Sequence, residues 1–173
     1  MKAIGVELVK KQDIAAIYQY LNTVAKQTDY LTFDSSGLTL SLAEFEQSIL
    51  QQLASANTVY FCYKLEGKII GLINLQIYPK TKMAHRATLG ISVLAEYQNQ
   101  GVGNALLTAL LAYAKQVEQL ELLELEVACE NTAAIHLYEK FGFKKIGELP
   151  RFFKMNQRYL DFIMMQLDLT SSK

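Results

Sequence analysis

The sequence predicts a single α/β domain. Its 173 residues are enough for one domain with a substantial core and too few for two of ordinary size. The composition, 51% hydrophobic and 20% charged, is typical of a globular protein. Apolar residues recur at helical spacing in some segments and at a period of two in others. In the later part of the chain these segments alternate, which predicts strands and helices in turn.

The first half of the chain predicts a strand followed by two helices. Residues 3–9 have the pattern of a strand, and residues 11–27 carry apolar side chains at helical spacing. After a turn-rich stretch, Ser41 and Glu44 have the spacing of a capping box, in which each side chain satisfies a main-chain N–H of the other. A second helix should therefore begin there and run to about residue 54.

From the middle of the chain onward, the pattern predicts strands that alternate with helices. A hairpin is expected around Gly67, because strand-like runs flank it on both sides and glycine favours the turn. A further helix should end at Gly142, a good C-terminal stop. The predicted elements are strands at residues 58–65, 68–78 and 85–94, a helix at 101–117, a strand at 121–128, a helix at 131–141, and strands at 143–149 and 158–169.

Charge and apolar runs indicate a soluble, cytoplasmic protein with neither a nucleic-acid nor a membrane partner. The chain has 17 Lys and Arg and 17 Asp and Glu, and its basic residues form no stripe of the kind that follows a nucleic-acid backbone. The N-terminus lacks the apolar centre of a signal peptide. No apolar run approaches the roughly 20 residues that cross a bilayer.

The cysteines and histidines predict neither a disulfide nor a metal site. Cys62 and Cys129 both lie in strand-like runs, where we expect small buried hydrophobic residues in a reducing compartment. The chain has only two histidines, from which a metal cluster of the usual kind is hard to assemble. We therefore expect no metal cofactor.

Gly101 and Gly103 stand where the helix at 101–117 should begin. Glycine weakens a helix by about 1 kcal/mol relative to alanine, so its presence there needs a reason. The first four N–H groups of a helix lack internal partners, and the aligned peptide dipoles place partial positive charge beside them. A phosphate accepts hydrogen bonds from these N–H groups and balances the partial charge. Glycine, which has no side chain, lets the phosphate touch the main chain. The pattern therefore indicates a phosphate-binding turn; with nothing bound, it would be a tight strand-to-helix turn.

Two well-known phosphate loops do not fit this turn. A dinucleotide-binding fold needs a third glycine where Leu106 stands. A nucleoside-triphosphate loop needs Lys followed by Ser or Thr, where this chain has Asn104 and Ala105. Nucleotide binding through the turn is therefore disfavoured.

The residues around the turn resemble the GNAT superfamily of N-acetyltransferases. Residues 98–103, Gln-Asn-Gln-Gly-Val-Gly, match its Q/R-x-x-G-x-G/A signature. Downstream, Asn131, Ala134, Tyr138 and the Phe-Gly-Phe at 141–143 match its second marker. Two signatures in the right order and at about the right distance argue against a chance match. The order of the elements extends the resemblance over nearly the whole chain.

The resemblance implies one GNAT domain over residues 1–173, with a mixed, mostly antiparallel central sheet that is flanked by helices and splayed at the cofactor site. It implies an N-acetyltransferase of the small bacterial type, with acetyl-CoA as cosubstrate. In such enzymes an amine attacks the thioester directly, so the protein holds both reactants, deprotonates the amine and stabilises the oxyanion. The acceptor would be a primary amine of a small molecule or a protein N-terminus. Family habit suggests a homodimer.

The resemblance also implies the site residues. Main-chain N–H groups of the glycine turn would bind the pyrophosphate, and the strand before it would pair with the pantetheine arm. An N–H near Val93 would polarise the thioester carbonyl. Tyr138 is the implied catalytic residue, a proton donor to the departing thiolate. The implied cofactor-binding residues are Ile91, Ser92, Val93, Gln98, Asn99, Gln100, Gly101, Val102, Gly103, Asn104, Asn131, Ala134 and Tyr138.

Several of these residues also have an ordinary structural interpretation. The side chains of Ile91 and Val93 fit the core of a sheet, while their main chain could still serve a ligand. Asn131 precedes a helix and is well placed as its N-cap. Tyr138 has core-like neighbours and could be an aromatic packed between helix and sheet. For Asn131 we give the N-cap and the coenzyme contact equal weight. For Tyr138 the family pattern favours the role of proton donor over that of a core aromatic residue.

The sequence leaves the general base open. Many GNAT members carry a glutamate on the strand before the glycine turn, whereas residues 84–90 here read AHRATLG. A histidine side chain can act as a base at neutral pH, so His85 is the other candidate in this segment, although a histidine at the edge of a strand is more often a surface residue. The missing glutamate keeps a second class of function open, a non-catalytic acyl-CoA-binding sensor module.

The acceptor is expected between residues 28–39 and the loop around residues 150–157. Tyr30, Phe33, Phe152 and Phe153 are the aromatic residues that could line it. A carboxylate there would favour a cationic amine, and Asp29 and Asp34 are the candidates.

Overall fold

Residues 5–33 and 35–172, which the computed structural model describes, contain seven strands and four α-helices. The strands are β1 (Gly5–Leu8), β2 (Thr58–Leu65), β3 (Lys68–Ile77), β4 (Arg86–Val93), β5 (Leu122–Ala128), β6 (Lys144–Met155) and β7 (Arg158–Asp168). The helices are α1 (Ile14–Val24), α2 (Leu42–Ala54), α3 (Val102–Ala114) and α4 (Thr132–Lys140). The predicted order of elements is confirmed. The first two residues of the strand predicted at 3–9 lie outside the described residues.

The strands follow the order β1-β2-β3-β4-β5-β7-β6 in one sheet. The pairs β1–β2, β2–β3, β5–β7 and β6–β7 are antiparallel. β4 and β5 pair in parallel through Arg86–Thr88 and Leu122–Glu124, and β4 itself continues to Val93. The expectation of a mixed, mostly antiparallel sheet with flanking helices is thereby confirmed.

The chain divides into two compact units, and the boundary runs through β4. The first unit ends at Gln76 and resumes for Gly90–Gln116, so it holds β1 to β3, the end of β4, and α1 to α3. The second unit consists of Ile77–Leu89 and the chain from Val117 onward, with the start of β4, β5 to β7, and α4. That residues 1–173 act as one domain stays a prediction.

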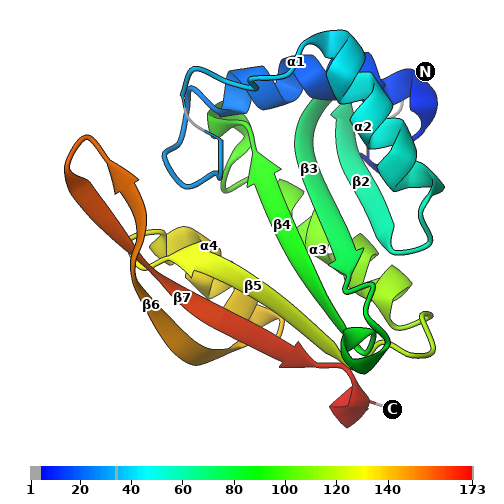
Figure 1. Cartoon of the computed structure of the whole chain (residues 1–173), viewed down its shortest axis with the longest axis vertical. Helices are drawn as coiled ribbons and strands as arrows, with labels where there is room; N and C mark the ends of the chain where they lie inside the picture. The colour runs from blue at the N-terminus through cyan, green and yellow to red at the C-terminus, as the bar shows by residue number, and fades with distance from the viewer. Residues whose placement is uncertain (1–4, 34, 173) are drawn as a thin grey trace. The chain divides into compact units, whose positions relative to one another are not determined.

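In the first unit, α1 and α2 lie over one face of β2 and β3, and α3 lies over the other (Figure 1). The helices bury the apolar faces that their spacing predicts. Gly71 on β3 allows the close approach of α3, because a Cβ atom there would lie 2.9 Å from side-chain atoms of both Val102 and Leu106. The first turns of α3 are therefore seated directly on β3. The largest fully buried side chains of this unit are Ile14, Ile17, Ile70, Ile73, Leu75, Leu94, Leu106, Leu107 and Leu110.

Local signals fix the boundaries of several elements as predicted. At the start of α2, the Ser41 N–H donates to the Glu44 carboxylate at 2.8 Å and the Glu44 N–H donates to Ser41 Oγ at 3.4 Å, which completes the capping box. Glu66 and Gly67 both have positive φ and form a two-residue turn between β2 and β3. Gly142, with φ 91°, ends α4.

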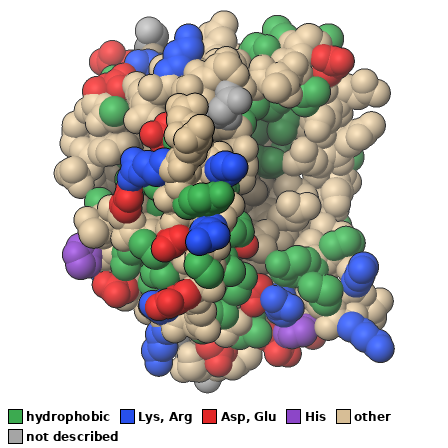
Figure 2. Space-filling model, turned by 60° about the vertical axis from the view of Figure 1, so that its left-hand side comes forward, with side chains coloured by type: hydrophobic (Ala, Val, Ile, Leu, Met, Phe, Trp, Pro, Cys, Tyr) green, Lys and Arg blue, Asp and Glu red, His purple; other side chains and the backbone are tan. Residues whose placement is uncertain are grey.

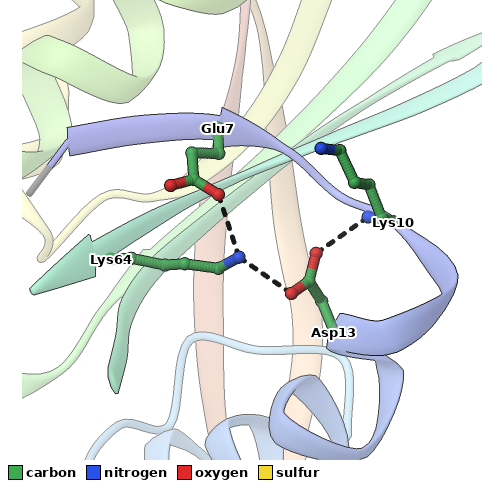
Figure 3. Close-up of polar contacts among 4 residues, drawn as sticks. All are labelled: Glu7, Lys10, Asp13 and Lys64. Atoms are coloured by element: carbon green, nitrogen blue, oxygen red, sulfur yellow. Dashed lines mark hydrogen bonds and ion pairs between the residues drawn. The ribbon is translucent and has the colours of Figure 1, made fainter. Parts of the chain in front are cut away.

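A polar cluster joins β1, β2 and the chain before α1 (Figure 3). Lys64 Nζ lies 2.8 Å from Asp13 Oδ1 and 3.0 Å from Glu7 Oε2, and the Lys10 N–H donates to Asp13 Oδ2 at 2.9 Å. Burial alone would raise the pKa of Asp13, but the hydrogen bonds from Lys64 and from the Lys10 main chain outweigh it and hold that pKa below its ordinary value. The Asp13 side chain is only 8% exposed, so its charge is satisfied within the protein.

In the second unit, a buried carboxylate on β5 accepts hydrogen bonds from both neighbouring strands. Glu124 is 3% exposed. Arg86 on β4 binds both of its oxygens, at 3.0 and 2.7 Å, and Gln166 on β7 donates to Oε1 at 3.0 Å. Two charge-assisted bonds from one guanidinium fix the geometry of the β4–β5 pair at the end of its ladder.

β6 is longer than predicted. The expected strand ended at Leu149, and the next residue, Pro150, lacks the N–H that a ladder uses. In the structure β6 passes Pro150 in a bulge between Leu149 and Phe153 and runs to Met155. Arg151, in the bulge, has φ 54°, and its N–H donates to Asp161 Oδ1 at 2.7 Å instead of to a ladder carbonyl. The Asp161 side chain, 10 residues away, thus satisfies an N–H group inside the bulge, and Asn156 and Gln157 make the turn to β7.

The two cysteines differ, and one expectation about them is wrong. Cys62 is buried on β2, where burial raises the pKa of its thiol to about 11. Cys129 is exposed, because β5 ends at Ala128 and Cys129 already belongs to the turn before α4. Both are free thiols.

Charged side chains of both signs are interspersed over the face of the molecule drawn in Figure 2. This agrees with the equal numbers of acidic and basic residues in the sequence. Among the described helices, none is both long enough and apolar enough to span a bilayer.

Candidate functional site

The glycine turn presents main chain rather than side chains at the start of α3. Gly101 is the N-cap with φ 85°, and no side chain caps the helix. Asn99 is also left-handed, with φ 58°. Left-handed residues within such a turn aim successive N–H groups to one side, the geometry of anion-binding nests. A Cβ added to Gly101 would meet nothing within 4 Å, so the space beside it is open. These residues fit the diphosphate of a coenzyme.

The glutamine side chains of the turn brace its own main chain. Gln98 Nε2 donates to the carbonyl of Val93 at 3.2 Å, and Gln100 Nε2 donates to that of Glu96 at 2.7 Å. The side-chain amides of Gln98 and Gln100 therefore hold the shape of the turn, so its main-chain N–H groups are the ones left to bind a ligand. The Val93 carbonyl is already engaged, so a pantetheine arm along β4 would have to use other main-chain groups of this strand.

Three further contacts hold the segment between β4 and α3 in place. The Leu94 N–H donates to the Ile70 carbonyl at 3.0 Å. Gln27, just after α1, accepts from the Ala95 N–H at 2.8 Å and donates to the Glu96 carboxylate at 3.3 Å. Since these contacts come from β3 and from the end of α1, the turn is positioned before any ligand arrives.

The end of β4 is partly open to solvent. Ile91, Ser92 and Val93 are all partly exposed, and Gly90 is exposed. Ser92 Oγ lies 2.9 Å from the hydroxyl of Tyr20, a residue of α1 that is only 4% exposed. Sequence analysis did not single out Tyr20, because its helical spacing fits an ordinary core position.

In the second unit, Asn131 acts as the N-cap of α4. Its Oδ1 accepts from the Ala134 N–H at 3.3 Å. The structural interpretation of Asn131 is thereby confirmed, while its contact with a coenzyme stays a prediction. The Ala134 N–H is used by this cap.

Tyr138 on α4 has a buried ring and an accessible hydroxyl. The residue is 5% exposed and its ring packs at 5.8 Å from that of Phe143. Every buried side-chain N or O atom within the described residues has a hydrogen-bond partner. The Tyr138 hydroxyl has no partner among these residues, so it is not one of the buried atoms. Its oxygen must therefore reach solvent. Burial raises the pKa of Tyr138, so the hydroxyl keeps its proton at neutral pH.

The aromatic residues proposed for the acceptor are distributed over both units. Tyr30 and Phe33 are partly exposed in the loop after α1, in the first unit. Phe152 is 39% exposed on β6 and stacks on Phe153, and both rings pack against Phe162 of β7, in the second unit.

The loop after α1 is tied back to that helix at its far end. Asn22 accepts from the Leu38 N–H at 3.0 Å, and the Tyr18 hydroxyl donates to the Leu40 carbonyl at 2.9 Å. Asp29 is exposed, and Asp34 lies outside the described residues.

No carboxylate lies on β4, so the strand glutamate of other GNAT members has no counterpart there. His85, in the turn before β4, is partly exposed, and its carbonyl accepts from the N–H groups of Glu121 and Leu122. On β5, Glu126 is exposed while every other residue of the strand is buried or partly buried. Among the described residues, no group of three or more His, Cys, Asp or Glu could hold a metal ion.

Residues 24–143 match the model of the acetyltransferase (GNAT) family. The matched segment contains α2, α3, the glycine turn and α4, and it covers more than half of the chain. The chain belongs to the GNAT family. This membership confirms the resemblance inferred from the two signatures, and it accounts for the mixed sheet and the uncapped start of α3.

Individual GNAT relatives differ in the acceptors that their names give. An N-alpha-acetyltransferase of Sulfurisphaera tokodaii is 32% identical over 114 residues, 60% of this chain and 67% of that protein. The crystal structure of a GNAT acetyltransferase from Streptococcus pneumoniae matches with a TM-score of 0.90 and 29% identity, and covers 96% of this chain and 99% of the other. A spermidine N-acetyltransferase from Vibrio cholerae in complex with CoA and spermine matches with a TM-score of 0.80 and 25% identity, over 96% of both chains.

The curated GNAT relatives are matched over 55–67% of their own length. Their shared activity is N-acetyl transfer, whereas their acceptors range from amino acids and spermidine to protein α-amino groups. The acceptor of this GNAT protein is therefore not given by similarity alone.

Proposed function

We propose that this chain is an enzyme that transfers the acetyl group of acetyl-CoA to a primary amine. The observation that carries the proposal is the start of α3, where no side chain caps the first turn and two left-handed residues open the main chain to an anion. Family membership supports the enzyme class, and the Vibrio cholerae relative, solved with CoA and spermine, supports the coenzyme.

The chemistry requires little beyond correct placement. The amine nitrogen attacks the thioester carbon and the carbonyl electrons move to oxygen. The carbonyl then re-forms as the C–S bond breaks to release a thiolate, and the nitrogen loses one proton to solvent. Holding the diphosphate at α3 and the pantetheine arm along β4 fixes the thioester, and such fixed geometry accounts for much of the rate enhancement of an acyl transfer. We assign oxyanion stabilisation to the Val93 N–H.

Tyr138 acts on the leaving group in this proposal. Its raised pKa lies above that of an ordinary thiol, near 8.5, so complete proton transfer to the thiolate is uphill. A hydrogen bond from the hydroxyl to the departing sulfur still lowers the barrier, because it stabilises charge that develops in the transition state. Tyr138 is therefore a hydrogen-bond donor to the leaving thiolate.

The acceptor that we propose is a small polyamine or amino acid, or a protein N-terminus, since these are the acceptors of related acetyltransferases. The whole chain should act as one catalytic domain, because the Streptococcus pneumoniae structure, which is matched over 99% of its own length, spans 96% of this chain. A cytoplasmic homodimer is the form expected from the sequence, and size-exclusion chromatography with light scattering tests the dimer.

An acetyl-transfer screen tests the function. Purified protein is mixed with acetyl-CoA and one amine at a time from a panel of polyamines, amino acids, aminoglycosides and peptides, and free CoA is measured. We expect at least one primary amine to raise CoA release well above the hydrolysis rate without amine. CoA binding with no turnover on any amine would instead support the sensor module, the alternative that the missing carboxylate on β4 favours.

A further inference from the structure

The side chain of Gln27 makes two contacts with the segment that leads into the glycine turn. Gln27 follows α1, whereas Ala95 and Glu96 lie between β4 and α3, 68 and 69 residues further along the chain. Gln27 Oε1 accepts a hydrogen bond from the Ala95 N–H at 2.8 Å, and Gln27 Nε2 donates one to Glu96 Oε2 at 3.3 Å. All three residues belong to the first unit.

A side-chain amide is the group that suits this pair of neighbours. The Ala95 N–H requires an acceptor and the Glu96 carboxylate requires a donor, and a glutamine amide offers one group of each kind. Rotating the Gln27 amide by half a turn would bring its NH₂ against an N–H and its oxygen against a carboxylate, so the two neighbours fix its orientation. A carboxylate in place of this amide would repel Glu96, and an ammonium group would offer the Ala95 N–H no acceptor.

The segment that Gln27 contacts sets the course of the chain into the glycine turn. Ala95–Tyr97 form a short 3₁₀ helix, and the Gln27 amide holds the first two residues of it. The Glu96 carbonyl in turn accepts from Gln100 Nε2 at 2.7 Å. Gln100 directly precedes Gly101, the N-cap of α3. Through Glu96 and Gln100, the Gln27 amide is therefore connected to the place where the first N–H groups of α3 are presented.

Lys68, on β3, also reaches this segment, but its contacts are weaker. Its Nζ lies 3.5 Å from Glu96 Oε1 and 5.4 Å from the centre of the Tyr97 ring. The side chains of Lys68 and Glu96 are 59% and 49% exposed, and ion pairs so open to solvent contribute little. Gln27 supplies two hydrogen bonds from one group, one of them to a charged carboxylate. Gln27 is therefore the stronger of these two side-chain anchors.

We propose that Gln27 is a positioning residue for the coenzyme, and that its amide holds Ala95 and Glu96 so that the N–H groups at the start of α3 face the diphosphate. This role rests on the proposed function, because it needs a coenzyme diphosphate at the glycine turn. A turn that is already fixed does not have to be ordered in the complex, which favours binding. Loss of the Gln27 amide should therefore weaken binding of the diphosphate and leave binding of the pantetheine arm unchanged.

The test measures the affinity of each variant for CoA and for pantetheine, which lacks the diphosphate, by isothermal titration calorimetry, together with its thermal stability. The variants are Gln27→Ala, Gln27→Glu, Glu96→Gln, and the double variant of Gln27→Glu with Glu96→Gln. The double variant exchanges the amide and the carboxylate, so the donor and the acceptor again face each other and the Ala95 N–H keeps an acceptor. Gln19→Ala is the control, because Gln19 is an exposed glutamine of α1.

We expect Gln27→Ala to weaken CoA binding about 5-fold, which corresponds to about 1 kcal/mol, the net contribution of a typical hydrogen bond. Gln27→Glu should weaken it about 10-fold, since two carboxylates then meet. Glu96→Gln, whose amide oxygen still accepts from Gln27, and the double variant should both stay within about 2-fold of the wild type. Pantetheine affinity should not change in any variant, and Gln19→Ala should bind both ligands as the wild type does.

Wild-type CoA affinity in Gln27→Ala would overturn the role of Gln27 and leave the proposed function standing. Equal losses for CoA and pantetheine in this variant would also overturn it, because they would indicate general damage to the site. A double variant that bound CoA no better than Gln27→Glu would contradict the pairing with Glu96. Failure of the wild-type protein to bind CoA would overturn the proposed function and this role together. If Gln27→Glu folds poorly, the comparison of Gln27→Ala with Gln19→Ala decides alone.

Discussion

Tyr138 is the residue at which a structural position and the proposed chemical role meet. Its ring belongs to the core of the second unit, while its hydroxyl reaches solvent and keeps its proton. Removing only the hydroxyl should therefore spare the fold and impair the reaction. We expect Tyr138→Phe to lower kcat about 100-fold, the lower end of the range for losing one hydrogen-bond donor to developing charge, and to leave CoA affinity within 2-fold.

Steady-state detection of free CoA, together with calorimetry, measures both effects of Tyr138→Phe. Tyr113→Phe is the matched control, because Tyr113 lies on α3 and its ring packs edge-on against Phe61. If Tyr138→Phe retained wild-type kcat, Tyr138 would be a core residue only.

Single residues differ in how well a sequence predicts them. Asn131 and Tyr138 could be named as candidates because they belong to one helix and its N-cap at a fixed local spacing. Tyr20 and Ser92 are 72 residues apart, and no local pattern joins two residues at that separation.

At the level of elements, the start of α3 depends on a glycine in the left-handed region. Gly101 has φ 85°, where a Cβ atom costs about 1–2 kcal/mol, although the space beside it is open. We expect Gly101→Ala to lower the free energy of unfolding by about 1 kcal/mol and to weaken CoA binding about 10-fold, because the strained turn no longer aligns its N–H groups.

Chemical denaturation and calorimetry check the two effects of Gly101→Ala, and Gly147→Ala is the control. Gly147, on β6, has no neighbour within 4 Å of an added Cβ and does not have a positive φ. It should bind CoA as the wild type does and lose no stability. A Gly101→Ala protein that matched Gly147→Ala in both measurements would show that the turn does not need its glycine.

Elements that follow local rules were predictable, and those that depend on distant partners were not. The capping box at Ser41 and the hairpin at Gly67 are specified within a few residues, and both formed as expected. β6 was predicted to end at Leu149, whereas Asp161 on the neighbouring strand accepts a hydrogen bond from the N–H of Arg151 in the bulge, and the strand continues to Met155. The bulge depends on a tertiary contact, which local propensity does not encode.

For the whole molecule, the polar cluster of Glu7, Lys10, Asp13 and Lys64 makes stability depend on pH. The pKa of Asp13 is lowered in the folded protein, so its carboxylate stabilises the fold above its unfolded pKa, near 3.9, and this contribution is lost as the pH falls through the lower folded value. We expect Asp13→Asn to lower the free energy of unfolding at pH 7 by about 3 kcal/mol, because Lys64 loses its less exposed partner.

Urea denaturation from pH 7 down to pH 3 tests the contribution of Asp13 to stability and its dependence on pH. The difference between wild type and Asp13→Asn should be constant near neutral pH and shrink below about pH 4. Glu7→Gln is the control, because the Glu7 side chain is 37% exposed and such a pair contributes at most about 1 kcal/mol. A loss from Glu7→Gln as large as that from Asp13→Asn would contradict the assignment.

The fold as a whole was predictable because its class depends on the order of elements and on two signatures, both visible in one sequence. The order of the strands in the sheet was not predicted, since a pairing such as β5 with β7 joins residues far apart in the chain. The acceptor was not predictable. Its candidate aromatic residues come from a loop and a bulged hairpin, where local patterns are weakest.

The coenzyme site is tested most directly by comparing the affinity of the wild-type protein for CoA and for pantetheine, which lacks the diphosphate. Isothermal titration calorimetry measures both. If the main chain of the glycine turn binds the diphosphate, CoA should bind at least 100-fold more tightly than pantetheine, a difference of about 2.7 kcal/mol. Equal affinities, or no heat of binding with CoA, would contradict a diphosphate site at the start of α3.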